Sequence, residues 1–191
     1  MKKTFSILLL WLCAIGTFAQ HPTFLGVSMG EMYTKIDSEL SRRHFRYVGS
    51  TEQYGYIFVQ KYKGTFATVQ DCEVEILYSC FTAKPIVITV SFPASTDSTS
   101  TVHFYNTVLE SLKEKYGEPQ ITTKESELLF HDSNKLAKFS DGAVRLSISG
   151  IKNHYYPYLE YLDEPNSKEH QRRVRWHEED EAKHNSSLDD L

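Results

Sequence analysis

The stretch that decides the fold is residues 100–119, which read S-T-V-H-F-Y-N-T-V-L-E-S-L-K-E-K-Y-G-E-P. Its apolar residues recur at the spacing of one helix face, and they are Tyr105, Val108, Leu109, Leu112 and Tyr116. Ser100 or Thr101 can cap the start of this helix, and Gly117 can end it in the left-handed conformation. Strand-like segments flank the predicted helix on both sides, so it marks the midpoint of the chain.

The flanking segments alternate apolar and polar residues, which is the period of a strand with one face in water. The clearest candidates are 56–62, 72–78, 86–92, 144–148 and 155–162, and the weaker ones are 46–49, 121–124, 127–130 and 135–139. Strands this close in sequence pair antiparallel by default. Asp141 and Gly142 predict a hairpin turn between two of them.

A second helix is predicted at residues 28–44, where Ser28 and Glu31 read as a capping box. Its apolar stripe consists of Met29, Met32, Ile36 and Leu40. We therefore expect an α+β fold, with two helices packed on an antiparallel sheet, over residues 20–163. The order of elements also raises the hypothesis of a tandem repeat of one helix and three or four strands, with halves at 24–93 and 100–163.

The first 19 residues have the pattern of a secretory signal peptide. Lys2 and Lys3 precede an apolar run over 5–15, and small residues stand at the expected cleavage point after Ala19. A retained membrane anchor and a lipoprotein signal at Cys13 are the alternatives, and the residues around Cys13 disfavour lipidation. We expect an exported protein, periplasmic or secreted.

The mature chain is acidic and has no later segment that could cross a membrane. Without Lys2 and Lys3, 19 basic residues stand against 25 acidic ones, a net charge of −6 with His neutral. This balance argues against nucleic acid or an anionic membrane surface as a partner.

Motifs for catalysis are missing from the sequence, which has no G-x-S-x-G, no Gly-rich phosphate loop and no H-E-x-x-H. A Cys–His pair using Cys72 or Cys80 is an alternative, but Cys72 is in phase with Val74 and Ile76, which predicts burial. A straight strand over 72–78 would also hold the two cysteines too far apart for a disulfide, so free thiols are favoured over a bridge. We expect no catalytic residues and no cofactor.

Residues 164–191 are highly charged, and we expect them to be disordered or a loose helix over 168–184. His170, His177 and His184 would share one helix face, but at about 10 Å intervals along the axis. One metal ion cannot reach all three, so no metal site is expected.

Aromatic residues are abundant, with 12 Tyr and 11 Phe in the chain. Tyrosine is enriched at recognition surfaces, so an exposed sheet face could bind a partner protein. The candidate residues for such a face are Tyr56, Phe58, Tyr62 and Tyr158. The alternative is that these rings complete a thin core beneath a single sheet.

Several short motifs, in their order, resemble small exported proteins of unknown function from Bacteroidetes. They are F-L-G-V-S-M-G, Y-K-G-T-F-A, E-K-Y-G-E-P and Y-L-E-Y-L-D, which together span residues 24–163. The helix-then-sheet order also resembles β-lactamase-inhibitor-like proteins, whose sheet binds a partner protein. This second resemblance concerns the fold alone and implies no functional residues here.

The sequence thus favours a non-enzymatic exported protein, a protein-binding or envelope-associated module that uses an exposed sheet face. The alternative is a structural or scaffolding protein of the envelope, with the charged tail as its contact, and an enzyme of unrecognised type is a third class. The oligomeric state is not predicted.

Overall fold

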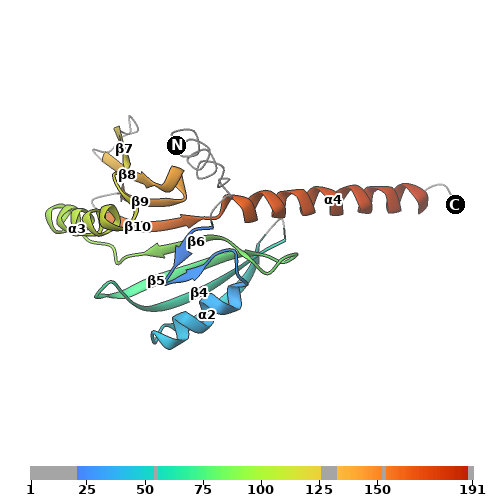
Figure 1. Ribbon diagram of the computed structural model, residues 1–191, viewed down its shortest axis with the longest axis horizontal. Coiled ribbons are helices and arrows are strands. Elements are labelled where there is room, and N and C mark those ends of the chain that lie inside the picture. The colour runs from blue at the N-terminus through green and yellow to red at the C-terminus, as the bar shows by residue number, and fades with distance from the viewer. Residues whose placement is uncertain (1–20, 54–55, 126–132, 152–153, 189–191) are drawn as a thin grey trace, which may run out of the picture.

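The computed structural model describes residues 21–53, 56–125, 133–151 and 154–188, and an eight-stranded antiparallel sheet organises them. The first four strands are β3 (Arg46–Gln53), β4 (Ile57–Phe66), β5 (Val69–Ser79) and β6 (Pro85–Ser91). The other four are β7 (Gln120–Glu125), β8 (Ser133–Phe139), β9 (Val144–Ile151) and β10 (His154–Leu162). The helices are α2 (Tyr33–Arg42), α3 (Ser98–Tyr116) and α4 (Glu164–Leu188), with a short pair β1 (Thr23–Phe24) and β2 (Val27–Ser28) before α2 (Figure 1). The expected α+β fold is confirmed.

The strand order is β3-β4-β5-β6-β10-β9-β8-β7, so two four-stranded meanders meet where β6 pairs with β10. Each meander follows one helix, α2 in the first half and α3 in the second. This is the order of elements that a tandem repeat would have, and a duplication remains a hypothesis. β10 is therefore a central strand. Its pairing with β6 begins at Tyr158, so Pro157 lies one residue outside the paired stretch, where the missing N–H of proline is tolerated.

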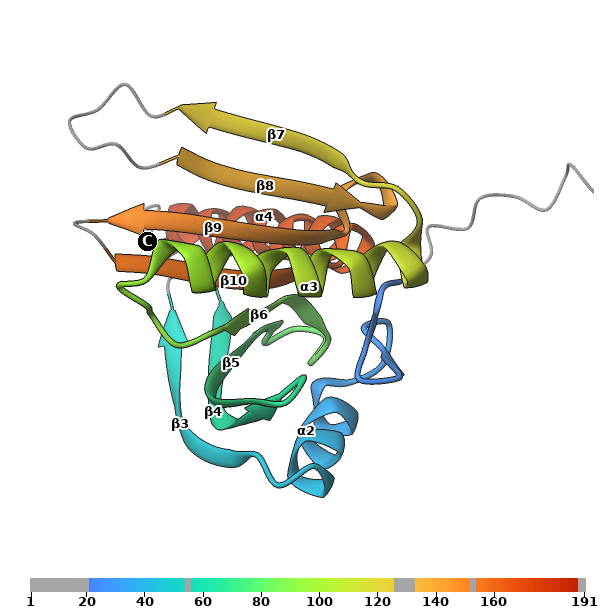
Figure 2. The same ribbon diagram turned by 90° about the vertical axis from the view of Figure 1, so that its left-hand side faces the viewer.

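One face of the sheet carries the core and is covered by α2 and α3. A row of buried side chains crosses the sheet at neighbouring register positions: Tyr62, Val74, Val90, Leu159, Leu146 and Ala137. Ile36 and Leu40 of α2 and Tyr105, Leu109 and Leu112 of α3 belong to the same buried cluster. Figure 2 shows α3 lying along β9 and β10, where the second half of this row is found.

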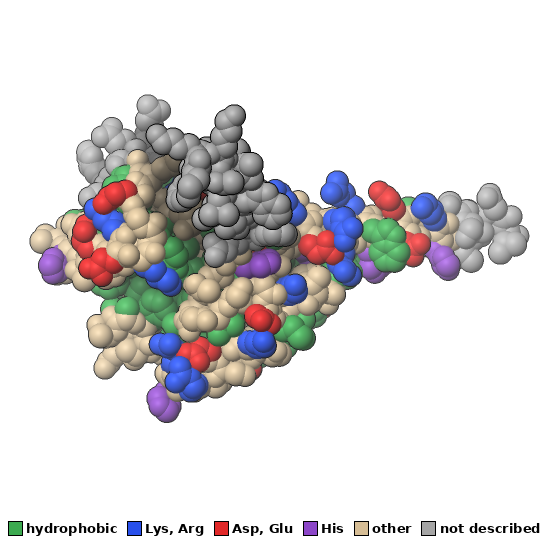
Figure 3. All heavy atoms as spheres, viewed as in Figure 1, with side chains coloured by type: hydrophobic (Ala, Val, Ile, Leu, Met, Phe, Trp, Pro, Cys, Tyr) green, Lys and Arg blue, Asp and Glu red, His purple; other side chains and the backbone are tan. Residues whose placement is uncertain are grey.

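Aromatic contacts connect the two halves of the core. Phe66 of β4 lies 6.1 Å from Phe92, ring centre to ring centre, and Phe92 lies 4.8 Å from Phe104 of α3. In the space-filling view, apolar side chains gather between α3 and β5 (Figure 3). The two halves therefore share one core.

The predicted central helix is confirmed, with a different cap. α3 begins at Ser98, and the carboxylate of Asp97 accepts the Thr99 N–H at 2.9 Å, the capping role expected of Ser100 or Thr101. Gly117 ends the helix at φ +82°, a conformation that costs a residue without Cβ very little.

The first helix starts later than expected, at Tyr33. Ser28 forms a tight turn instead of a helix start, because its Oγ accepts the Gly30 N–H at 3.1 Å. The bond expected between the Met29 carbonyl and the Tyr33 N–H is absent, since Met29 O accepts from Asn166 and Tyr33 N donates to Ala83 O. Met29 belongs to this turn and is fully buried. Met32, which was expected in the apolar stripe of the helix, is 51% exposed.

Cys72 is buried in phase with Val74 and Ile76, as predicted, and Cys80 is exposed at the end of β5. Both thiols are free. No helix among the described residues is long and apolar enough to span a membrane. The predicted signal peptide at 1–19, with Cys13, and the candidate strand at 127–130 lie outside the described residues.

Candidate binding site

The four residues predicted to form one binding face do not lie together. Phe58 and Tyr62 point to the helix-covered face of β4, and Tyr62 is only 1% exposed. Tyr158 alternates with the buried Leu159 and so lies on the opposite face of the sheet. Tyr56 precedes β4, and its ring stacks 5.0 Å from that of His177 on α4. The prediction that all four residues form one binding face is therefore wrong, although Phe58 and Tyr62 do lie in one site.

That site is a group of five rings, which we call the tyrosine cluster: Tyr33, Tyr47, Phe58, Tyr62 and Tyr78. The Tyr33 and Tyr78 rings are stacked at 4.0 Å with 16° between their planes, and Phe58 stacks on Tyr78 at 5.8 Å. Tyr47 meets Tyr62 edge-on at 5.6 Å. Such ring pairs contribute about 0.5–1.5 kcal/mol each beyond the area they bury, so the cluster is a rigid surface.

Strand register assembles the cluster from segments that are far apart in the chain. Phe58 of β4 is directly opposite Tyr78 of β5, and Tyr47 of β3 is directly opposite Tyr62 of β4. Side chains of directly opposite residues lie close together on the same face of a sheet. α2 then places Tyr33 over Tyr78.

A carboxylate and an amide lie at the base of the cluster. The Tyr62 hydroxyl donates to Asp37 of α2 at 2.8 Å, and the side-chain oxygen of Gln60 lies 2.6 Å from the same hydroxyl. Burial, followed by the bond to Asp37, raises the pKa of Tyr62 far above its usual range. Burial likewise raises the pKa of Tyr78 to about 12. Both phenols therefore stay neutral at physiological pH and remain hydrogen-bond donors.

The cluster combines a buried floor with an exposed rim. Tyr62 is the floor, whereas Tyr33, Phe58 and Tyr78 are half-buried and Tyr47 is 53% exposed. Met32, beside Tyr33 in the chain, adds a second exposed apolar side chain. Sequence reasoning missed Tyr33, Tyr47 and Tyr78. Tyr78 could have been found from the pairing of two adjacent aromatic strands, but Tyr33 could not, because its position depends on where α2 begins.

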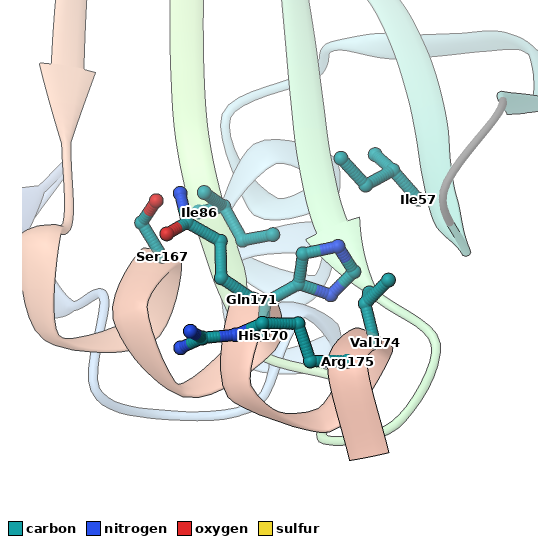
Figure 4. Close-up of a pocket in the computed structure, with 7 residues that line it drawn as sticks. All are labelled: Ile57, Ile86, Ser167, His170, Gln171, Val174 and Arg175. Carbon is teal, nitrogen blue, oxygen red and sulfur yellow. The ribbon is translucent and has the colours of Figure 1, made fainter. Parts of the chain in front are cut away.

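A hollow lies beneath α4, apart from the tyrosine cluster, and has a volume of about 560 Å³. Figure 4 shows its lining residues, which are Ile57, Ile86, Ser167, His170, Gln171, Val174 and Arg175. One side chain of this hollow, His170, lies 3.0 Å from the Ser79 hydroxyl, which is within reach for activating a nucleophile. Ser79 is however fully buried and its oxygen already accepts the Phe81 N–H at 3.2 Å, so no substrate carbonyl can approach it. The contact holds α4 against β5.

A buried polar network fixes the start of α4. The Asp163 carboxylate accepts the Asn166 N–H at 2.8 Å, as a helix cap does, and lies 2.6 Å from His21 Nδ1. The Asn166 side-chain amide donates to the carbonyl oxygens of Met29 and Pro85, each at 2.8 Å. Three distant parts of the chain therefore meet at Asn166.

The charged segment, for which disorder and a loose helix were both expected, is the 25-residue helix α4. Its first two turns are ordered by Asp163, Asn166 and the buried His170. In the part of the chain that the structure describes, no three His, Cys, Asp or Glu side chains are placed to hold a metal ion.

No protein-family model matches this sequence, and neither the curated proteins nor the solved structures provide a match.

Proposed function

We propose that this protein is an exported, non-enzymatic protein-binding module and that the tyrosine cluster is its binding surface. The proposal moves the expected binding face from the open side of the sheet to the rim between α2, β3 and β5. Export rests on the pattern of the first 19 residues.

The observation that carries the proposal is the rim itself, where Tyr33, Tyr78 and Phe58 are stacked. Tyr47, in contact with Tyr62, is 53% exposed, and Met32, next to Tyr33 in the chain, is 51% exposed. Protein interfaces are enriched in Tyr and Met relative to the rest of a protein surface, and Tyr anchors dominate binding energies. Because stacking already holds Tyr33, Phe58 and Tyr78, a partner would bind them with little loss of side-chain entropy.

Asp37 and Gln60 give this surface a polar centre. Asp37 is half-buried and has the Tyr62 hydroxyl as a neighbour, so a donor from the partner could share its carboxylate. A partner segment that carries an apolar side chain and an Arg fits this combination, since a guanidinium stacks on Tyr faces and pairs with carboxylates.

A scaffolding role in the envelope is the second candidate. It is favoured by α4, which projects from the body so that its C-terminal end lies far from the sheet (Figure 1). In that role α4, and not the tyrosine cluster, would make the contact.

The test is site-specific photo-crosslinking in the cell that exports the protein. A photoreactive amino acid replaces Tyr47, and the matched control replaces Ile121, which is 59% exposed on β7 at the other edge of the sheet. We expect one discrete adduct from position 47 that is lost when Met32→Ala and Tyr33→Ala are added. Equal adducts from both positions, or none from position 47, would refute the binding surface.

A further inference from the structure

The outer face of α4 carries a row of exposed and, at Glu169, partly exposed residues, which we call the α4 stripe. Its members are Glu169, Arg172, Arg173, Trp176, Glu179, Asp180 and Lys183. Their spacing of three and four residues places them on one side of the helix. Charged side chains of both signs line the projecting part of α4 (Figure 3).

This stripe is distinct from the side of α4 that faces the body. Asn166 and His170 are buried against the body, and Val174 lines the hollow beneath the helix. Trp176, by contrast, is 68% exposed, the largest value among the exposed large apolar side chains of the described residues. The exposed indole therefore lies at the middle of a row of charged side chains.

Residues of the stripe at equal distances before and after Trp176 have opposite charges. Arg172 and Arg173 lie four and three residues before it, and Asp180 and Glu179 lie four and three residues after it. Glu169 and Lys183, seven residues to either side, again have opposite signs. α4 itself runs from Glu164 to Leu188, so Trp176 is also its midpoint.

We propose that the α4 stripe binds the same stripe of a second copy of this chain, with the two helices antiparallel and a two-fold axis at Trp176. Arg172 then faces Asp180 of the second copy, Arg173 faces Glu179, and Glu169 faces Lys183. Each contact occurs twice, as two-fold symmetry requires. A parallel pair would instead place Arg against Arg and Asp against Asp.

The rest of the molecule is compatible with this arrangement. α4 spans about 37 Å, and in an antiparallel pair the second body lies beside the far end of the first helix. That end lies away from the body in Figure 1. The bonds of Glu169 to Arg172 at 2.8 Å and to Arg173 at 2.7 Å are exposed ion pairs, so their exchange for contacts between copies costs little.

The expected dimer is weak and depends on salt. A contact of two helices with one apolar pair is small for a protein interface, so we expect a Kd on the order of 10–100 μM. The charge pairs are exposed, and raising the salt from about 0.01 M to about 1 M shortens the screening length from ~30 Å to ~3 Å. The dimer should weaken at least tenfold over that range.

The test is a charge swap followed by sedimentation equilibrium of the purified chain. One variant carries Arg172→Glu and Arg173→Glu, a second carries Glu179→Arg and Asp180→Arg, and a third carries all four substitutions. We expect the wild type to dimerise, the first two variants to be monomeric alone and to dimerise when mixed, and the third variant to dimerise by itself. Circular dichroism verifies that α4 is still helical in each variant.

The first two variants decide the orientation, because each turns the contacts of an antiparallel pair from attractive to repulsive, whereas a parallel pair faces like charges in the wild type and in either variant. Trp176 gives a second readout, since its emission should shift to the blue as the concentration rises and the indole leaves water. A wild type that stays monomeric at about 1 mM, far above the expected Kd, overturns the proposal. A dimer that the first two variants do not disrupt, or that the combined variant does not restore, also overturns it.

Discussion

Asn166 offers the sharpest test of how the fold is held together. Its side-chain amide donates to Met29 O and Pro85 O, each at 2.8 Å, and the residue is 6% exposed. Asn166→Ala leaves two carbonyl oxygens without this donor in a buried position. An unpaired buried acceptor costs about 1–3 kcal/mol, so two of them would cost about 2–6 kcal/mol. We expect the free energy of unfolding to fall by an amount in the lower part of that range, about 2–4 kcal/mol.

The assay is urea unfolding, in which the midpoint should fall while the slope with denaturant stays constant. For a chain of this size the melting temperature should fall by about 4–16 °C. Amide hydrogen exchange should accelerate first in the opening turns of α4, because Asn166 connects them to the residues before α2 and to β6.

Two further variants make the result interpretable. Gln171→Ala changes an exposed residue of the same helix and should shift stability by less than about 0.5 kcal/mol. Asn166→Asp keeps the shape of the side chain but places a carboxylate oxygen against the two carbonyl oxygens. At neutral pH it should therefore destabilise the protein at least as much as Asn166→Ala does. When the new carboxyl is protonated, the loss of stability should be smaller. An Asn166→Ala variant as stable as Gln171→Ala would refute the anchoring role.

Three other outcomes are expected. Because the pKa of Tyr78 is raised to about 12 in the folded protein, ionisation of this phenol favours the unfolded chain. The stability that the neutral phenol contributes is therefore fully present below about pH 10 and is lost as the pH rises through the folded pKa. An absorbance titration of tyrosinate in which every tyrosine ionises near its usual pKa would contradict this. A thiol reagent should modify the exposed Cys80 in the folded protein and the buried Cys72 only after unfolding, as mass spectrometry can show. The reaction of Cys80 should be faster at alkaline pH, because partial desolvation of its thiol raises the pKa of Cys80. Asp97→Ala should lower the melting temperature by more than Asp97→Asn does, since the amide of Asn still accepts the Thr99 N–H but lacks the charge. The pKa of Asp97 is lowered by its bonds to Ser100 and Thr99, so the stability that the charged cap adds is lost as the pH falls through that pKa.

Much of the architecture could be predicted from local pattern. The apolar stripe of α3, the stop at Gly117 and the alternation of the strands follow from the helical and strand periods, which depend on neighbours in the chain alone. The start of α2 could not be predicted in this way. Met29 looks like a helix residue, but its carbonyl bonds to Asn166, which is 137 residues away.

Only part of the candidate site could be predicted from the sequence. Phe58 and Tyr62 were identified because they alternate along one strand, but alternation does not say whether a face is covered by a helix. Tyr158 belongs to an equally regular strand and lies on the other side of the sheet. Assigning a face requires the register of every strand between β4 and β10.

The charged segment shows the limit most clearly. Its composition alone predicts weak order, because it has too few apolar residues to form a core. The signal that could have located its start is D-E-P-N at 163–166, a capping residue followed by an acidic residue and a proline in the first helical turn. That signal starts a helix, but the burial of Asn166 and His170 keeps its first turns in place.

The sequence by itself determined α3 and most of the strands, because hydrophobic period, caps and turn residues act within a few residues of one another. The tertiary structure alone decided that four tyrosines and Phe58 form one surface, that Tyr62 is its floor, and that α4 leaves the body with Trp176 exposed. The physical reason is that these properties depend on register and burial, which are set by contacts between residues far apart in the chain.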